Sequence, residues 1–253
     1  MDQPILYVFN ISHYCEKARW ALDHCGIAYR VQHVMPGRHR QIARKLGARG
    51  GSVPFFDVGD QVIVGSSAII DWAETHRAND APSLAGSDPE QVRAIEKRLD
   101  DIAGVHVRRF FYSDALTENP KSVRPIFSNG LPFWQRLSVI VAWPKMVALM
   151  KKMMDLGPAQ REESRAIVDA EVAWLDSLLD DGRPFLTGSE FTRADLTAAA
   201  LLAPIVDPKE HPVHGLITLP TNVAATMQAW AERPSLRMVR EAYASRRNCR
   251  RQS

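Results

Sequence analysis

A segment dense in turn-forming residues, RANDAPSLAGSDPEQ, separates two parts of this 253-residue sequence that differ in the spacing of their apolar residues. Clustered Pro, Gly, Ser and Asp interrupt both helices and strands, so the segment predicts a linker. Short β-branched runs alternate with helical patterns before it, whereas only long helical periodicities follow it. We therefore predict two domains, at residues 1–80 and 90–245, joined by a linker at 81–89.

The first part contains alternating strand and helix signals. Its patterns predict strands at 5–9, 29–34, 53–57 and 61–64, helices at 12–25 and 66–76, and a basic loop with one helical turn before the third strand. This order is β-α-β followed by β-β-α, which requires a parallel crossover pair and an antiparallel hairpin in one small mixed sheet.

The second part carries helical periodicity alone. Helices are predicted at 90–118, 131–155, 158–181, 193–204 and 222–245, and no convincing strand occurs. The predicted fold class is therefore α/β plus all-α, with a mixed-sheet domain followed by an all-helical domain.

The charge distribution argues against a nucleic-acid partner. The formal net charge is +3, but four of the basic residues lie in the last eight positions. Without those four, acidic and basic residues nearly balance, and phosphate binding needs cations gathered on one folded surface. We interpret residues 246–253 as a basic flexible tail.

The three cysteines, at positions 15, 25 and 249, form neither a C-x-x-C pair nor a zinc-type spacing with histidine. We therefore predict no disulfide framework, no metal site and a reduced, cytoplasmic protein. The longest apolar stretch, residues 131–150, is interrupted by charged residues and a proline, so no membrane span is predicted.

The helix at 12–25 opens with an S-x-x-C arrangement, Ser12 and Cys15. A helix N-terminus has free N–H groups and about half a positive charge, so it stabilises an anion such as a thiolate. Because serine replaces the first cysteine of a redox pair, Ser12 cannot take part in disulfide exchange. Its hydroxyl can instead donate a hydrogen bond to a thiolate on a ligand, or simply cap the helix.

Two further segments fit the same chemistry. Pro54 follows Val53 at the start of a predicted strand, where a cis peptide bond would turn the Val53 backbone toward a peptide-like ligand. Gly65, Ser66 and Ser67 precede the helix at 66–76, whose free N–H groups suit a carboxylate.

Together these motifs resemble the glutathione transferase superfamily: the S-x-x-C helix start, the Val-Pro pair and G-S-S-A-I, which is similar to the family's E/Q-S-x-A-I. The resemblance covers nearly the whole chain. It implies a thioredoxin-like domain at 1–80, and its helical domain includes a capping box that Thr192 and Asp195 match.

The resemblance also implies roles for individual residues. Ser12 would donate a hydrogen bond to the glutathione sulfur, Val53 would pair with the cysteinyl backbone beside Pro54, and Ser66 would hold the γ-glutamyl carboxylate. Position 65 is Gly where the family usually has Glu or Gln, so one side-chain contact to the γ-glutamyl group is missing. Ser67 is the candidate to replace that contact. For the glycine carboxylate we select His39 from a basic loop that also offers Arg38, Arg40 and Arg49, because Ser52 stands where the family commonly has a basic or amide residue.

Rival groups for the sulfur site remain open. Cys15 is a possible alternative nucleophile, although a cysteine on the apolar helix face more often packs as a small hydrophobe. Tyr7 and Tyr14 are alternative activators.

The implied activity is glutathione transfer, as in detoxification: attack of the glutathione thiolate on a hydrophobic electrophile, without metal. The electrophile pocket would include Phe111, Tyr112 and Trp143. The resemblance implies a homodimer. Two alternatives are a non-catalytic glutathione-binding or scaffold protein and a Cys15-dependent thiol reductase or isomerase.

Overall fold

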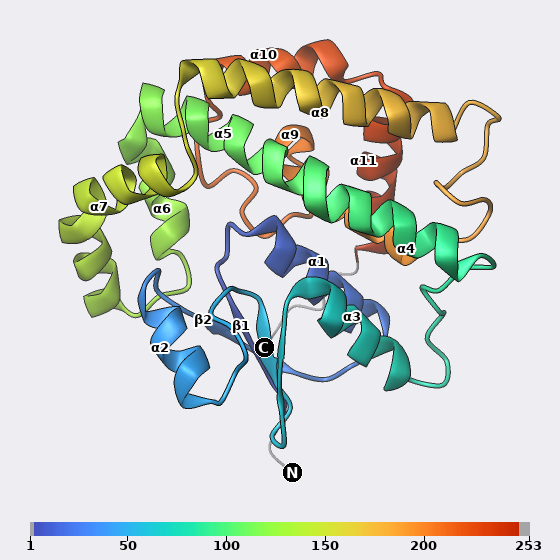
Figure 1. The fold of residues 1–253 in the computed structure, drawn as a ribbon, viewed down its shortest axis with the longest axis horizontal. Coiled ribbons are helices and arrows are strands. Elements are labelled where there is room, and N and C mark those ends of the chain that lie inside the picture. The colour runs from blue at the N-terminus through green and yellow to red at the C-terminus, as the bar shows by residue number, and fades with distance from the viewer. Residues whose placement is uncertain (1–2, 248–253) are drawn as a thin grey trace.

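The computed structural model describes residues 3–247, which form a sheet domain and a helical domain packed on it (Figure 1). The sheet domain consists of β1 (Ile5–Val8), α1 (His13–His24), β2 (Arg30–His33), α2 (Arg38–Lys45), β3 (Phe55–Asp57), β4 (Val62–Val64) and α3 (Ser66–Thr75). The helical domain consists of α4 (Pro89–Arg98), a π-helical segment (Leu99–Ala103), α5 (Gly104–Glu118), α6 (Pro120–Ser128), α7 (Phe133–Met153), α8 (Pro158–Leu178), α9 (Arg193–Val206), α10 (Thr221–Trp230) and α11 (Pro234–Arg246). Over the described residues, no helix is both long and apolar enough to cross a bilayer.

The four strands form one mixed sheet in the order β2-β1-β3-β4. β1 and β2 are parallel, while β1 with β3 and β3 with β4 are antiparallel. The predicted fold class, with its crossover pair and hairpin, is confirmed. Leu6 and Val8 of β1 are fully buried, and α1 and α3 lie between the sheet and the helical domain.

Proline positions explain most differences between the predicted and observed helices. Pro120 opens α6, a separate helix that the periodicity did not predict. Pro234 opens α11, so the predicted helix at 222–245 is two helices. Proline lacks the amide hydrogen and disfavours a helical residue before it, which favours a helix boundary at Pro120 and at Pro234. The predicted single helical turn in the basic loop is the eight-residue α2.

The capping box of α9 is confirmed. An Asp195 carboxylate oxygen accepts the Thr192 backbone N–H at 2.8 Å, and the other accepts the Leu186 N–H at 2.7 Å. These bonds satisfy buried donors at the start of α9, which contributes many of the buried core residues of the helical domain.

The end of the described chain differs from the predicted tail. Arg246 is the last residue of α11, and the buried Arg247 donates to Glu16 at 2.6 Å and to Asp23 at 2.7 Å on α1. Opposite charges so close, shielded from water, explain why Arg247 is not a solvated tail residue. The remainder of that prediction, residues 248–253, lies outside the described residues.

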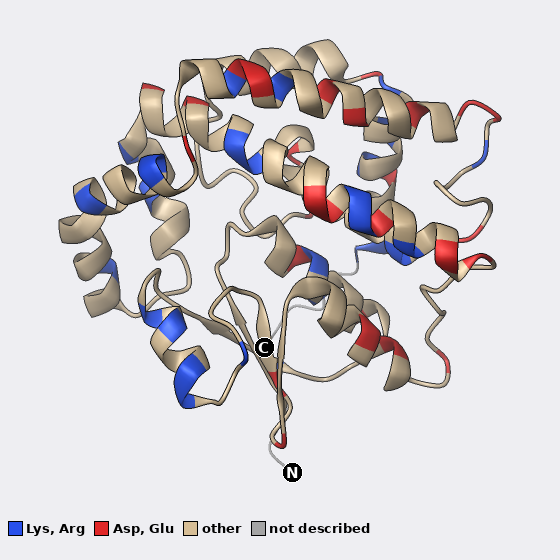
Figure 2. Cartoon of the chain, in the orientation of Figure 1, with Lys and Arg blue, Asp and Glu red and all other residues tan. Residues whose placement is uncertain are grey.

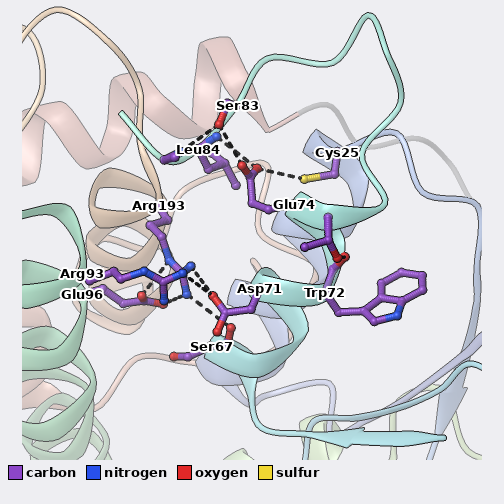
Figure 3. Close-up of polar contacts among 12 residues, drawn as sticks. Cys25, Ser67, Asp71, Trp72, Glu74, Ser83, Leu84, Arg93, Glu96 and Arg193 are labelled. Atoms are coloured by element: carbon purple, nitrogen blue, oxygen red, sulfur yellow. Dashed lines mark hydrogen bonds and ion pairs between the residues drawn. The ribbon is translucent and has the colours of Figure 1, made fainter. Parts of the chain in front are cut away.

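A buried ionic network joins the two domains. The Lys17 ammonium on α1 has no exposed surface and lies 2.8 Å from Glu96 and 2.7 Å from Asp100. Figure 3 shows its continuation, in which Arg193 of α9 contacts both Glu96 and Asp71. The network thus connects α1 and α3 to α4 and α9.

Candidate active site

A cavity of about 1020 Å³ lies between the two domains. The sheet domain contributes the end of β1, the start of α1, part of α2 and the turn before β3. The helical domain contributes residues of α5, α6, α7 and the end of α9 with the loop that follows it. Ligand pockets commonly measure about 300–1,000 Å³, so this cavity has room for more than one small molecule.

Ser12 lies on the cavity wall as the N-cap of α1. Its hydroxyl oxygen accepts the Cys15 backbone N–H at 3.4 Å. Because capping uses the oxygen as an acceptor, the hydroxyl hydrogen is available to a ligand. The site therefore combines an O–H donor with the positive end of a helix.

Cys15 is placed differently, with about 1% of its surface exposed. Burial raises the pKa of its thiol to about 11, against the lowering effect of the Ser12 hydrogen bond. The thiol therefore stays protonated at neutral pH, and Cys15 does not line the cavity.

The two tyrosines are also engaged elsewhere. Tyr14 lines the cavity, but its hydroxyl donates to the Asp100 backbone carbonyl at 2.7 Å, and burial raises its pKa to about 12. The ring of Tyr7 stacks on Phe55 with centroids 4.6 Å apart and does not line the cavity.

The Val53–Pro54 peptide bond is cis. Val53 lines the cavity, whereas Pro54 is buried behind it. The Pro54 carbonyl accepts the Gly65 N–H at 3.0 Å, which fixes this turn against the start of α3. Ser12 and Val53 thus line the same cavity, although in the sequence they are separated by about half the length of the sheet domain.

The start of α3 lies outside the residues that line the cavity. Gly65 is its N-cap, with φ of 95°, and Ser66 is buried at the first helical position. The Ser67 hydroxyl donates to Asp100 at 2.8 Å and accepts from Lys17 at 3.1 Å. Ser67 is therefore part of the interdomain network.

His39 lines the cavity and accepts the Gly37 N–H at Nδ1 over 3.1 Å. Burial lowers its pKa, so it is neutral at physiological pH. The cations in this region are Arg40 and Arg44, which line the cavity, while Arg38 and Arg49 do not. Figure 2 shows the basic residues of α2, with no acidic residue among them.

Of the predicted electrophile-pocket residues, Phe111 and Tyr112 line the cavity. Trp143 does not; it is buried and donates its indole N–H to the Pro120 carbonyl at 3.0 Å. Arg108 is a lining residue that sequence reasoning missed. The spacing of Arg108, Phe111 and Tyr112 at i, i+3 and i+4 was the available signal, because such residues share one helix face.

Comparison with protein families gives a match over residues 6–81 to the glutathione S-transferase N-terminal domain. A search of curated proteins found nothing similar to the sequence.

Solved structures resemble the chain over nearly its full length. The β-etherase LigF from Sphingobium sp. strain SYK-6 has 17% identity and a TM-score of 0.60, covering 95% of this chain and 99% of that one. The glutathione transferase GSTFuA3 from Phanerochaete chrysosporium has 16% identity and a TM-score of 0.63, covering 96% and 97%. A glutathione S-transferase I bound with lactoylglutathione has 14% identity and a TM-score of 0.52, covering 95% and 99%.

At these identities the structural likeness establishes the fold. The match over residues 6–81 shows that the sheet domain is similar to the N-terminal domain of glutathione S-transferases.

Proposed function

We propose that this protein is a glutathione transferase in which Ser12 stabilises the glutathione thiolate. The observation that carries the proposal is the Ser12 hydroxyl at the N-terminus of α1, on a cavity that continues to an apolar wall of the helical domain. A free thiol has a pKa of about 8.5, and a helix N-terminus with a hydrogen-bond donor lowers it toward neutrality.

The proposed reaction is a substitution or conjugate addition at an electrophilic carbon. In substitution, the thiol proton leaves to solvent, the sulfur forms a carbon–sulfur bond, and the leaving group departs with the bonding electron pair. Ser12 donates to the sulfur throughout and is not consumed. The apolar wall holds the electrophile and excludes water, which strengthens the hydrogen bond to sulfur.

Glutathione would pair its cysteinyl backbone with Val53 in the cavity, and its γ-glutamyl carboxylate would extend beyond the lining residues to the N-terminus of α3 at Ser66. Gly65 supplies no side chain there. For the glycine carboxylate, the neutral His39 can provide a hydrogen bond, and Arg40 and Arg44 provide positive charge.

One observation favours a second candidate, a glutathione-binding protein without transferase activity. Ser67, the predicted substitute for the missing side chain at Gly65, already bonds Lys17 and Asp100. Without a side-chain contact from position 65 or 67, the γ-glutamyl end of glutathione is less firmly oriented, and a bound thiolate that is poorly oriented for attack would give binding without transfer.

The test combines calorimetry of glutathione binding with turnover of chlorodinitrobenzene. We expect Ser12→Ala to bind glutathione nearly as well as the unaltered protein but to lose about 10- to 100-fold in kcat/KM, the value of a hydrogen bond to a charged group. Cys15→Ala is the matched control and should retain activity. Unchanged turnover in Ser12→Ala would refute the mechanism.

Other outcomes discriminate the alternatives. Activity lost in Cys15→Ala and kept in Ser12→Ala would favour thiol exchange. Glutathione binding without turnover of any electrophile would favour the second candidate. We also propose a cytoplasmic homodimer with a role in detoxification; light scattering after gel filtration measures the oligomeric state.

A further inference from the structure

Arg108 on α5 is a cation at the cavity that has no hydrogen-bond or ion-pair partner among the described residues. It lines the cavity one helical turn before Tyr112. Within residues 3–247 its guanidinium makes no ion pair, and its buried Nε has no hydrogen-bond partner. The neighbouring Arg109 is different, because it bonds Asp155 and Glu163, each at 2.7 Å.

The surroundings of Arg108 do not neutralise it. Together with burial, its charge lowers the pKa of His13 to about 3, so that ring is neutral. Asp207 is the one carboxylate among the described lining residues, and it lies 3.1 Å from His214. An unpaired charge in a partly buried site is costly unless a ligand compensates it.

Apart from Arg108, Tyr112, Asp207 and His211, the helical domain lines the cavity with apolar residues and glycine. Phe111, Ile126, Phe127 and Met150 line it. The other lining cations, Arg40 and Arg44, come from α2 in the sheet domain, where the glycine carboxylate of glutathione is proposed. Arg108 is therefore the cation that the helical domain supplies for a second ligand.

We propose that Arg108 binds a carboxylate on the acceptor substrate, so that this protein conjugates hydrophobic acids; this inference rests on the proposed transferase function. A guanidinium presents two parallel N–H donors that match a carboxylate. The Tyr112 hydroxyl, one turn along the same face of α5, is a further donor. The apolar wall contacts the body of the acid, and the ion pair fixes which end faces the sulfur.

The experiment compares two glutathione conjugates, S-benzylglutathione and S-(para-carboxybenzyl)glutathione, by calorimetry. We expect Arg108→Met to weaken binding of the carboxylated conjugate about 10- to 100-fold and to change binding of the benzyl conjugate less than about threefold. Arg108→Lys should recover part of the loss. Arg165→Met removes the same charge on α8, away from the cavity, and should match the unaltered protein.

Equal weakening of both conjugates, or weaker binding of glutathione itself, would overturn the proposal, because Arg108 would then serve glutathione or the fold. No effect on either conjugate would also overturn it.

Failure of the proposed function is a separate result. It appears as an unaltered protein that binds neither glutathione nor S-benzylglutathione. Direct binding of a hydrophobic acid, phenylbutyrate, then tests Arg108 alone: selective loss in Arg108→Met supports the carboxylate site, and equal binding overturns it.

Discussion

Replacing Lys17 by methionine tests the network that joins the domains. Lys17 has no exposed surface, and its ammonium lies within 2.8 Å of both Glu96 and Asp100. Methionine keeps most of the volume but leaves two carboxylates without this cation. Breaking a buried ion pair in this way costs about 3–5 kcal/mol.

The lower end of that range applies here for two reasons. Arg193 still contacts Glu96 at 2.7 Å, and the Asp100 side chain is 18% exposed, so water partly solvates it. We therefore expect a loss of about 3 kcal/mol. For a chain of this length the entropy of unfolding converts that loss to about 6 °C in Tm.

The assay is chemical and thermal unfolding of Lys17→Met followed by circular dichroism. Lys97→Met makes the same chemical change at a solvent-exposed pair with Asp101 and should leave Tm unchanged. Adding Asp100→Asn to Lys17→Met should recover at least about 1 kcal/mol, since the uncompensated charge is removed. A Lys17→Met protein as stable as Lys97→Met would refute the reasoning.

Three further outcomes are expected. Burial opposes ionisation of Glu96, but Lys17 and Arg193 outweigh burial and hold the pKa of Glu96 below the ordinary 4.5. The ionised Glu96 therefore stabilises the fold above pH 4.5, and this stabilisation is lost as the pH falls through the folded pKa. Urea unfolding at a series of pH values measures the loss. Gly130→Ala should lower the free energy of unfolding by about 2 kcal/mol, because φ is +79° and a Cβ would lie 2.5 Å from the His33 side chain. Gly59→Ala is the control, because Gly59 also has a positive φ but open space around it, so this change measures only the cost of the backbone conformation. Cys15, with its pKa near 11, should be alkylated at pH 8 at least about 100-fold more slowly in the folded protein than in urea, as followed by mass spectrometry.

Local patterns in the sequence were sufficient for the strands, α1 and α3 of the sheet domain, but not for the length of α2. Alternation and β-branched residues locate a strand, and the start of α1 follows from Ser12 as its cap, because these signals act within a few residues. The helix boundary at Pro234 and the separate helix that begins at Pro120 are indicated by the proline positions and not by the periodicity of apolar residues. Fold class was therefore predictable, while helix boundaries near proline were less so.

The candidate site was predictable only in part, because part of it depends on domain packing. Ser12 and Val53 are in motifs and lie on one cavity. By contrast, Ser67 bonds Asp100 across the domain boundary, and nothing near it in the sequence indicates that contact. Arg108 and Arg109 are adjacent, and the sequence alone does not indicate that, among the described residues, Arg109 contacts carboxylates on α8 and the segment before it while Arg108 contacts none.

The contact between Arg247 and Glu16 has a consequence for how the two domains fold. The two residues are 231 positions apart, and Glu16 lies in α1 of the sheet domain. Its buried carboxylate acquires this counter-charge only when the segment after α11 packs against α1. The sheet domain therefore reaches its final electrostatic balance only after the helical domain has folded, which couples the stability of one domain to the completeness of the other.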